Sequence, residues 1–168
     1  IARAESNTYY PEFEKTDLAL LIETVLEELK AKAAERNISL KLICEPEPQM
    51  LLCDFNLMMQ LLLNLIQNAI NYGRDGGTVE VTLKKENEHY QIHVRDDGIG
   101  IPEDCLDKIW GRFFRVDASH SKKEGSGLGL FMEKWIVELH GGSAKVKSMT
   151  DLGSIFTVSL PVREAERE

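Results

Sequence analysis

Residues 54–72, DFNLMMQLLLNLIQNAINY, predict the central element of the fold. Asp54 is a good helix N-cap because its carboxylate can accept otherwise unpaired N–H groups of the first turn. The following residues, about 17 of them, contain no Gly or Pro and therefore predict one continuous helix. Leucine, methionine, isoleucine and alanine cover most of its surface, which indicates a helix packed in a core.

One narrow face of this predicted helix carries only side-chain amides. At about 100° per residue, five of them share an arc of about 100°: Gln60, Asn64, Gln67, Asn68 and Asn71. Asn is a poor helix former, and amides both donate and accept hydrogen bonds. The stripe therefore fits a ligand such as a metal ion or phosphate oxygens. A half-exposed polar face on a core helix explains the stripe alone equally well.

Length and charge limit the classes of protein to consider. The 168 residues fit one domain with a real core, and the net charge of -8 argues against nucleic acid as a partner. Cys44, Cys53 and Cys105 lack metal-ligand spacing and indicate a reducing compartment. No apolar run approaches the roughly 18 residues of a membrane span. The chain begins at Ile1 without Met, so we expect a piece of a longer protein with no membrane contact of its own.

Apolar periodicity predicts three long helices and about six strands. A helix capped by Thr16 or Asp17 is expected to run to about Asn37, before the central helix, and a third from Gly125 to near His140. A shorter helix is expected at 103–110. Alternation of apolar and polar residues predicts strands at 38–42, 50–53, 78–84, 90–95, 143–149 and 154–160.

Two predicted hairpins determine the fold class. Two short turns join neighbouring predicted strands into antiparallel pairs. They are Glu86-Asn87-Glu88 and Asp151-Leu152-Gly153. We therefore expect an α+β two-layer sandwich, in which a mixed, mostly antiparallel sheet of about five strands is covered on one face by three helices. No G-x-x-x-x-G-K loop occurs, and Gly98 does not open a dinucleotide-binding turn. Residues 1–16 are expected to be a linker or the tail of a preceding dimerisation helix, residues 17–162 the domain, and residues 163–168 a charged tail.

Three short motifs, in order along the chain, carry the most specific chemistry. They are Asn64-x-x-x-Asn68, Asp96-x-Gly98-x-Gly100 and Gly125-x-Gly127-x-Gly129, with Phe113-Phe114-Arg115 before the last. Together they resemble the N, G1, F and G2 boxes of sensor histidine kinases. The resemblance runs from about Asp17 to Pro161 and implies the catalytic ATP-binding domain of that family.

For the adenine base, the resemblance implies that Asp96 accepts a hydrogen bond from the amino group. Gly98 and Gly100 are expected to let the backbone approach the purine and adopt positive φ. Thr157 resembles the family's strand residue that backs the adenine, although an ordinary strand Thr is nearly as good an interpretation. The expected base site also includes Ile99 and Ile101.

For the phosphates, the resemblance implies that Asn68 binds Mg²⁺, with Asn64 one turn away in support. Neutral oxygen ligands suit a hard cation that keeps several waters. Asn71 stands where many relatives carry a Lys on the phosphates, so this chain lacks that charge. Tyr72 is expected either to stack or hydrogen-bond near the nucleotide, or to be structural.

The segment 111–124 is expected to be a lid that supplies positive charge. Arg112, Arg115, Lys122 and Lys123 cluster there in an otherwise acidic chain, and a loop can close over a polyphosphate. Arg115 is the expected phosphate contact, whereas the two lysines either join it or form a solvated pair. The glycine segment is expected to present backbone N–H groups to an anion at a helix N-terminus. The remaining expected contacts are Phe113, Gly125, Gly127, Leu128, Gly129 and Leu130.

The reaction implied by the resemblance is transfer of the γ-phosphoryl group of MgATP to a histidine. His89, His93, His120 and His140 all lack the His-Glu/Asp-x-x-x-Pro context of the family's phosphoacceptor helix. The acceptor is therefore expected on a separate dimerisation domain of the same full-length kinase, for relay to a response regulator receiver domain. The resemblance also implies a cytoplasmic, monomeric domain of a protein anchored in the membrane.

Two other functions remain open from the sequence. The related ATPases of the gyrase, mismatch-repair and heat-shock-chaperone type place Glu where Asn64 stands, to activate water. Asn cannot accept that proton, which favours transfer over hydrolysis. A non-catalytic nucleotide-binding module used for docking is the second alternative, and the intact Asn68, Asp96 and glycines argue against it.

Overall fold

The uncharged segment after Asp54 forms the central helix, α3 (Phe55–Tyr72), in the computed structural model, which describes residues 9–111 and 130–163. The Asp54 carboxylate accepts the Leu57 N–H at 3.0 Å, which confirms the predicted N-cap. Most apolar side chains of α3 are buried, whereas all five amides of the stripe are half-buried. The helix therefore packs its apolar face inward and leaves the stripe at its edge.

The sheet beneath α3 has the strand order β2-β4-β5-β7-β6. Only the pair β2 and β4 is parallel, which confirms a mixed, mostly antiparallel sheet. Alternate residues of the central strands are buried under the helices, because successive side chains point to opposite faces. The strands are β2 (Ser39–Ile43), β4 (Thr78–Glu86), β5 (His89–Asp96), β6 (Ser143–Met149) and β7 (Gly153–Pro161).

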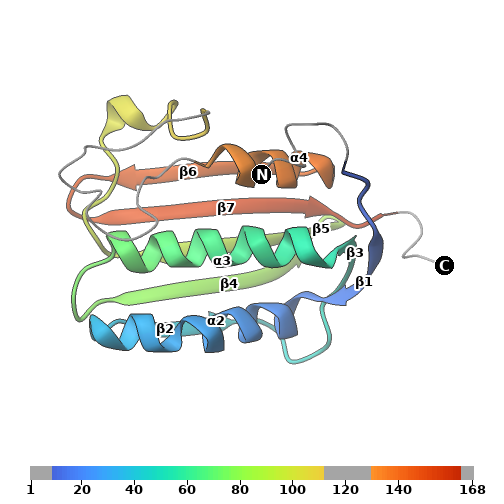
Figure 1. The fold of residues 1–168 in the computed structure, drawn as a ribbon, viewed down its shortest axis with the longest axis horizontal. Helices are drawn as coiled ribbons and strands as arrows, with labels where there is room; N and C mark the ends of the chain where they lie inside the picture. The colour runs from blue at the N-terminus through green and yellow to red at the C-terminus, as the bar shows by residue number, and fades with distance from the viewer. Residues whose placement is uncertain (1–8, 112–129, 164–168) are drawn as a thin grey trace.

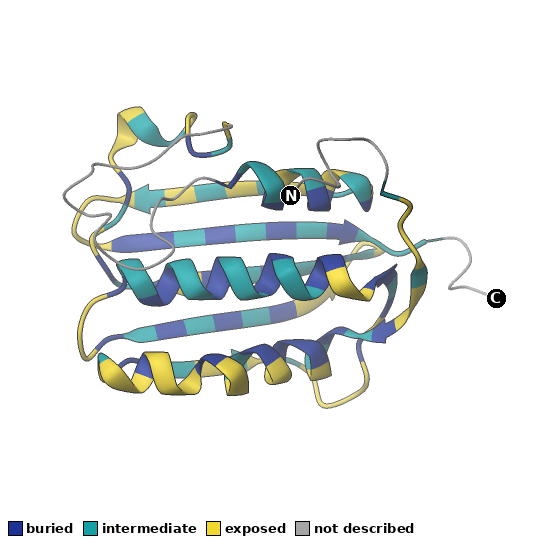
Figure 2. Ribbon diagram, viewed as in Figure 1, coloured by how far each residue is buried: buried dark blue, intermediate teal, exposed yellow. Residues whose placement is uncertain are grey.

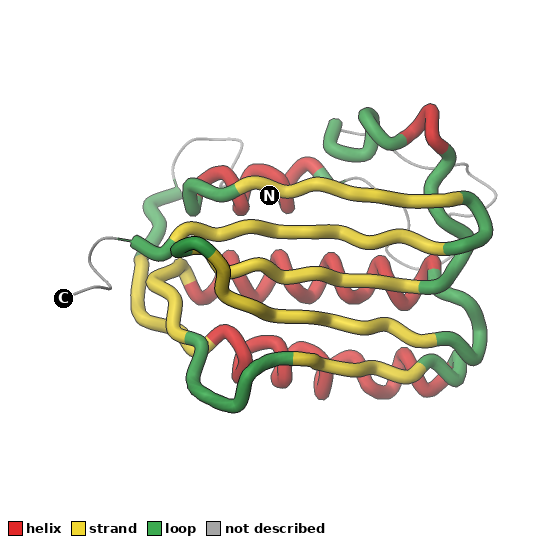
Figure 3. The backbone as a smooth tube through the Cα atoms, turned by 180° about the vertical axis from the view of Figure 1, so that it is seen from behind, coloured by secondary structure: helices red, strands yellow, loops and turns green. Residues whose placement is uncertain are grey.

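The helices α2 (Leu18–Glu35) and α4 (Phe131–Leu139) lie on either side of α3, on the same face of the sheet (Figure 1). Figure 2 shows buried residues recurring along the three helices and alternating along the central strands, and these residues form one hydrophobic core. Seen from behind, the other face of the sheet carries no helix in the described part of the chain (Figure 3). The predicted two-layer α+β sandwich is therefore confirmed. Among the described residues, no helix combines the length and apolarity that a membrane crossing requires.

A second, two-stranded sheet was not expected from the sequence. β1 (Phe13–Asp17) pairs antiparallel with β3 (Met50–Asp54), although we expected residues 13–16 to belong to a linker. Thr16 is the one buried residue of β1, so the strand has no apolar alternation that could have predicted it. Backbone pairing with β3 holds it in place.

Two helix predictions differ from the structure. In place of a helix over 103–110, there is a single 3₁₀ turn, η1 (Glu103–Cys105), followed by further turns. The segment is too short to form a stable α-helix unless one face of that helix packs against the core. The last helix begins at Phe131, with Leu130 as its N-cap residue, whereas we expected it to open at Gly125.

Candidate nucleotide site

Strand β5 ends in a buried carboxylate. Asp96 is only 4% exposed and lies on the face of the sheet that the helices cover. Its Oδ1 accepts the Gly98 N–H at 2.9 Å, and the Ser154 backbone also donates to the carboxylate. Burial raises the pKa of Asp96 to about 6, since these hydrogen bonds only partly replace water and Asp97 adds repulsion. Such a rigidly held carboxylate is a strong acceptor for an N–H group of a ligand.

The loop after Asp96 lies between the end of α3 and the β6–β7 turn and is hydrogen-bonded to both. Ile99 donates its N–H to the Tyr72 carbonyl at 3.2 Å, and its own carbonyl accepts the Asp151 N–H at 2.7 Å. Gly100 has φ of +75°, as predicted, whereas Gly98 does not have positive φ. A Cβ at Gly98 would overlap the Tyr72 carbonyl oxygen, so the close approach that requires this glycine is to α3.

Two serines that the sequence analysis missed support this loop. Ser148 Oγ accepts the Ile101 N–H at 2.7 Å and lies 2.8 Å from Ser154 Oγ. Ser154 in turn is the cross-strand partner of Asp96. The two hydroxyl groups therefore connect both strands of the β6–β7 hairpin to the loop beside the buried carboxylate. No sequence motif marks these serines, and only the pairing of the strands shows that they lie beside this loop.

The structure separates Thr157 from the other predicted site residues. Ser154, Phe156 and Val158 are buried under the helices, so Thr157 points to the opposite face of the sheet. There its Oγ1 lies 2.9 Å from His93 Nδ1. Ser154, and not Thr157, is the β7 residue that lies beside Asp96 on the face that the helices cover.

The amide stripe of α3 leads toward the Asp96 loop. Asn64, Asn68, Asn71 and Tyr72 are all half-buried, and the Tyr72 carbonyl contacts the loop directly. Asn68 lies one turn before Tyr72, about 6 Å along the helix axis. The C-terminal end of α3 therefore brings the predicted metal and base residues to one end of the molecule.

Arg36, the C-cap residue of α2, holds the end of α3. Arg36 donates to the carbonyl oxygens of Ile70, of Asn71 at 3.0 Å and of Gly73 at 2.7 Å. Its Nε also pairs with Asp75 at 2.7 Å. Ile70 and Asn71 belong to the last turn of α3, where carbonyls lack the N–H partners of a continuing helix, so a cation there is favourable in both hydrogen bonding and charge.

A family model described as "Histidine kinase-, DNA gyrase B-, and HSP90-like ATPase" matches residues 53–164. The chain belongs to this ATPase family. Within it, the sensor protein SrrB of Staphylococcus aureus is 39% identical over 112 residues, which are 66% of this chain and 19% of SrrB. The chain thus spans about a fifth of the length of this relative.

Solved structures of histidine kinases share the fold of this ATPase domain. The catalytic domain of ThkA is 28% identical with a TM-score of 0.79, over 89% of this chain and 95% of that one. A mycobacterial sensor histidine kinase, MprB, is 27% identical with a TM-score of 0.77, over 90% and 99%. These similarities confirm the prediction of the ATP-binding domain of a sensor histidine kinase.

Leu130 does not have the position that we predicted in this ATPase domain. Its side chain is 1% exposed in the core, and its N–H donates to the Ile109 carbonyl at 2.7 Å, so it offers no donor to an anion. Ile101 is likewise buried, whereas Ile99 is 39% exposed at the rim of the loop. The other predicted residues of the lid and glycine segment lie outside the described residues: Arg112, Phe113, Arg115, Lys122, Lys123, Gly125, Gly127, Leu128 and Gly129.

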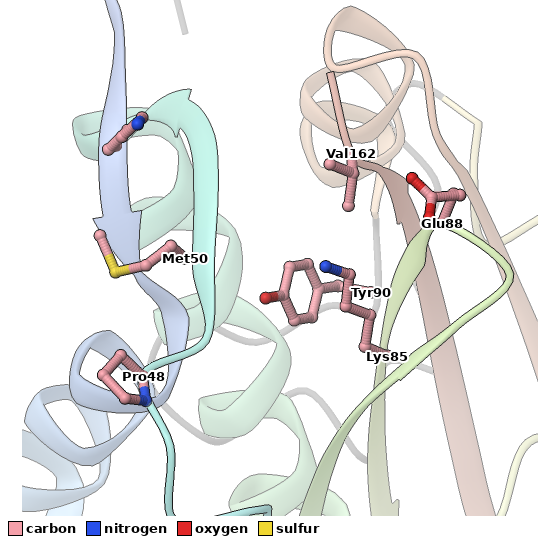
Figure 4. A pocket seen from close by; sticks show the side chains of 7 residues that line it. Pro48, Met50, Lys85, Glu88, Tyr90 and Val162 are labelled. Carbon is pink, nitrogen blue, oxygen red and sulfur yellow. The ribbon is translucent and has the colours of Figure 1, made fainter. Parts of the chain in front are cut away.

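A cavity of about 780 Å³ lies at the opposite end of the domain, between the β1–β3 sheet and the β4–β5 hairpin (Figure 4). Tyr90, near the start of β5, points into it, whereas Asp96 ends the same strand. None of the predicted nucleotide residues lines it. The cavity is lined by Lys15, Pro48, Met50, Lys85, Glu88, Tyr90 and Val162.

Proposed function

We propose that this chain binds MgATP and transfers its γ-phosphoryl group to a histidine on a separate dimerisation domain. The observation that carries the proposal is the buried Asp96 carboxylate, whose loop is bonded directly to the C-terminal end of α3. This contact brings the Asp96 carboxylate and the amide-bearing end of α3 to one end of the domain, an arrangement that would suit a base and its phosphates. The family and the histidine kinase relatives support the same function.

The Asp96 loop is suited to hold adenine. The carboxylate would accept the amino N–H of the base, and its surroundings make that bond strong because little water competes for it. The loop is held in position, because the backbone N–H groups of Ile99 and Ile101 both donate hydrogen bonds to neighbouring elements. Such a preformed site lowers the entropy cost of binding.

The amide side chains of α3 suit a metal that arrives with the nucleotide. In the described part of the chain, no group of three His, Cys, Asp or Glu side chains forms a metal site. Asn68 offers a neutral oxygen, which fits Mg²⁺ when phosphates and water supply its other ligands. The ion would neutralise phosphate charge, and Arg115 of the lid is the proposed second source of positive charge.

Transfer is favoured over hydrolysis by the surroundings of Asn64. The related ATPases need a carboxylate at this position to activate water. Glu133 lies beside Asn64, but its Oε2 accepts the Asn64 amide N–H and its side chain is 4% exposed. A carboxylate occupied and buried in this way is poorly placed to reach water. We therefore propose slow ATP hydrolysis and transfer to an external histidine.

The proposed partners follow from the relatives. ThkA has been solved in complex with the response regulator TrrA, and it shares 26% identity and a TM-score of 0.74 with this chain. We propose that the full-length protein likewise binds a response regulator, and that it relays phosphate from its dimerisation domain to the receiver domain of that partner.

Titration of the purified chain with ATP, with and without Mg²⁺, tests the nucleotide site. Asn68→Ala is expected to remove the gain in affinity that Mg²⁺ gives, because the proposed ligand oxygen is lost. Gln60→Ala, a half-buried amide of the same stripe two turns earlier, is the matched control and is expected to bind as the parent does. Mg²⁺-dependent affinity that survives Asn68→Ala would disprove the proposed ligand.

Incubation of the chain with labelled ATP and a separate histidine-bearing helical domain tests the transfer. Acid-labile label on that domain is the expected product. ATP binding without transfer would indicate that the chain is a non-catalytic docking module. Rapid phosphate release without transfer would indicate a hydrolase.

A further inference from the structure

Helix α4 buries a carboxylate that the sequence motifs do not include. Glu133 is 4% exposed and lines a small, largely apolar gap between α3, α4 and the sheet, together with Leu61, Leu65, Trp110 and Phe156. Burying a carboxylate among apolar side chains costs several kcal/mol unless it is well paired. Its partner is the Nδ2 amide of Asn64 on α3.

Since Asn64 belongs to the proposed phosphate-binding stripe, this contact joins the site to α4. We propose that Glu133 is a positioning residue: it accepts the Asn64 Nδ2–H and so directs the Asn64 carbonyl oxygen toward the bound nucleotide and its metal. This inference rests on the proposed function.

The chemistry of the two groups determines the orientation. An ionised carboxylate only accepts hydrogen bonds, so the amide must turn its NH₂ group to Glu133. The nitrogen and oxygen of an amide point in different directions from one carbon, so committing the nitrogen to α4 leaves the oxygen for the other side. Without Glu133, the amide could rotate and present an N–H group, which cannot bind a cation, in place of the oxygen.

A purely structural role explains the carboxylate poorly. Most residues that line the gap are apolar, although Lys145 also lines it, and a leucine at position 133 would match this apolar majority. Replacing both partners of a buried polar pair by apolar side chains is often neutral or stabilising, whereas removing one partner leaves the other without a hydrogen bond. Asn64 is half-buried, so water can reach its NH₂ group when Glu133 alone is replaced, and the cost to stability is expected to be small.

The test compares Glu133→Leu with Glu133→Gln. We expect Glu133→Leu to change the thermal unfolding midpoint little and to weaken MgATP binding roughly tenfold, the value of one charge-assisted hydrogen bond. Glu133→Gln retains an acceptor oxygen and is expected to bind MgATP within about threefold of the parent. In an Asn64→Ala background, Glu133→Leu is expected to cause no further loss, because the two residues act through one contact.

The controls separate this inference from the proposed function. Absence of Mg²⁺-dependent ATP binding by the parent chain would refute the proposed function, and the positioning role with it. If the parent binds MgATP and Glu133→Leu binds it equally well, only the positioning role is refuted. Adenosine, which lacks phosphates, is expected to bind both proteins equally. Failure of both Glu133→Leu and Glu133→Met to fold would also overturn the proposal, since Glu133 would then be a structural requirement.

Discussion

Asp96 shows how the surroundings of one residue set its chemistry. Its pKa of about 6 in the structure is above that of an ordinary Asp because the side chain is buried. A base that donates an N–H group to Asp96 favours the ionised form, so the pKa is expected to fall when the base binds. Base binding therefore releases a proton when the pH is near or below 6.

This linkage predicts how base affinity depends on pH. Adenosine is the appropriate ligand because it carries no phosphate that titrates in the same range. Its affinity is expected to be constant above about pH 7 and to fall below pH 6, by up to about tenfold per pH unit. Calorimetric titration between pH 5 and 8 measures this. Asp96→Asn is expected to bind more weakly at pH 7.5 and to lose the pH dependence, whereas a flat profile in the parent would contradict the role of Asp96.

Gly98 is a residue at which one methyl group matters. Gly98→Ala would force a Cβ against the Tyr72 carbonyl oxygen, so either the loop or the end of α3 must move. The expected result is a loss of roughly 2 kcal/mol in the free energy of unfolding and much weaker ATP binding. Urea denaturation and ATP titration measure the two effects.

Gly111→Ala is the matched control. Among the described residues, a Cβ at this exposed glycine would meet the Lys108 carbonyl oxygen alone, at 3.3 Å. We expect it to change the free energy of unfolding little, and it serves as a control for stability alone because residue 111 begins the predicted lid. Equal free energies of unfolding for the two alanine variants would show that the Gly98 contact does not hold the loop.

At the scale of elements, the end of α3 depends on α2. Arg36 satisfies carbonyl groups of the last turn of α3 and also binds Gly73, which leads to the next strand. The helix has no basic residue of its own in its last turn. The position of the Asn68 turn beside the Asp96 loop is therefore maintained from a different helix.

Arg36→Met keeps the aliphatic part of the side chain and removes its donors. We expect a loss of roughly 2 kcal/mol in the free energy of unfolding, because several carbonyls lose a charged partner at once, and weaker MgATP binding. Lys30→Met, on the exposed face of the same helix, is the control. Unchanged MgATP affinity in a destabilised Arg36→Met would mean that the end of α3 keeps its position without this contact.

At the scale of the whole molecule, His140 joins the end of α4 to the start of α3. Its Nε2 accepts the Asp54 N–H at 3.1 Å, and its Nδ1 lies 2.8 Å from the Ile136 carbonyl oxygen. The ring also stacks on Phe13 of β1, with 5.1 Å between centroids. These contacts require the neutral ring with its proton on Nδ1, and burial lowers the pKa of His140 in agreement.

A histidine that is kept neutral by folding makes stability depend on pH. Its folded pKa lies below the unfolded value of about 6.5, so its contribution is complete above that pH and is lost as the pH falls through it. We expect His140→Gln to cost roughly 2 kcal/mol at pH 7.5 and clearly less at pH 5.5. Urea denaturation of both proteins at the two pH values measures this.

Comparing the parent with His140→Gln isolates the contribution of His140 to the pH dependence of stability. Asp96 and Glu133 have raised pKa values and act in the opposite direction, since the folded state binds their protons more tightly, but they are present in both proteins. A difference in stability that does not change with pH would contradict a neutral, buried His140.

The sequence by itself determined the features that depend on neighbouring residues. The Asp54 cap, the long helix after it, the two hairpins and the positive φ of Gly100 are all local, and local periodicity was enough to predict the sandwich of helices on a sheet. The boxes around Asn64, Asn68 and Asp96 were also identified from short motifs.

Only the tertiary structure decided which distant residues meet. Alternation along β7 divides its residues into two faces, but only pairing with β5 shows that Ser154, and not Thr157, lies beside Asp96. The contacts of Glu133 with Asn64 and of Arg36 with the end of α3 likewise join separate helices. Such contacts depend on strand register and on how helices pack over the sheet, which are set by the burial of the whole core and leave no periodic signal in any one segment.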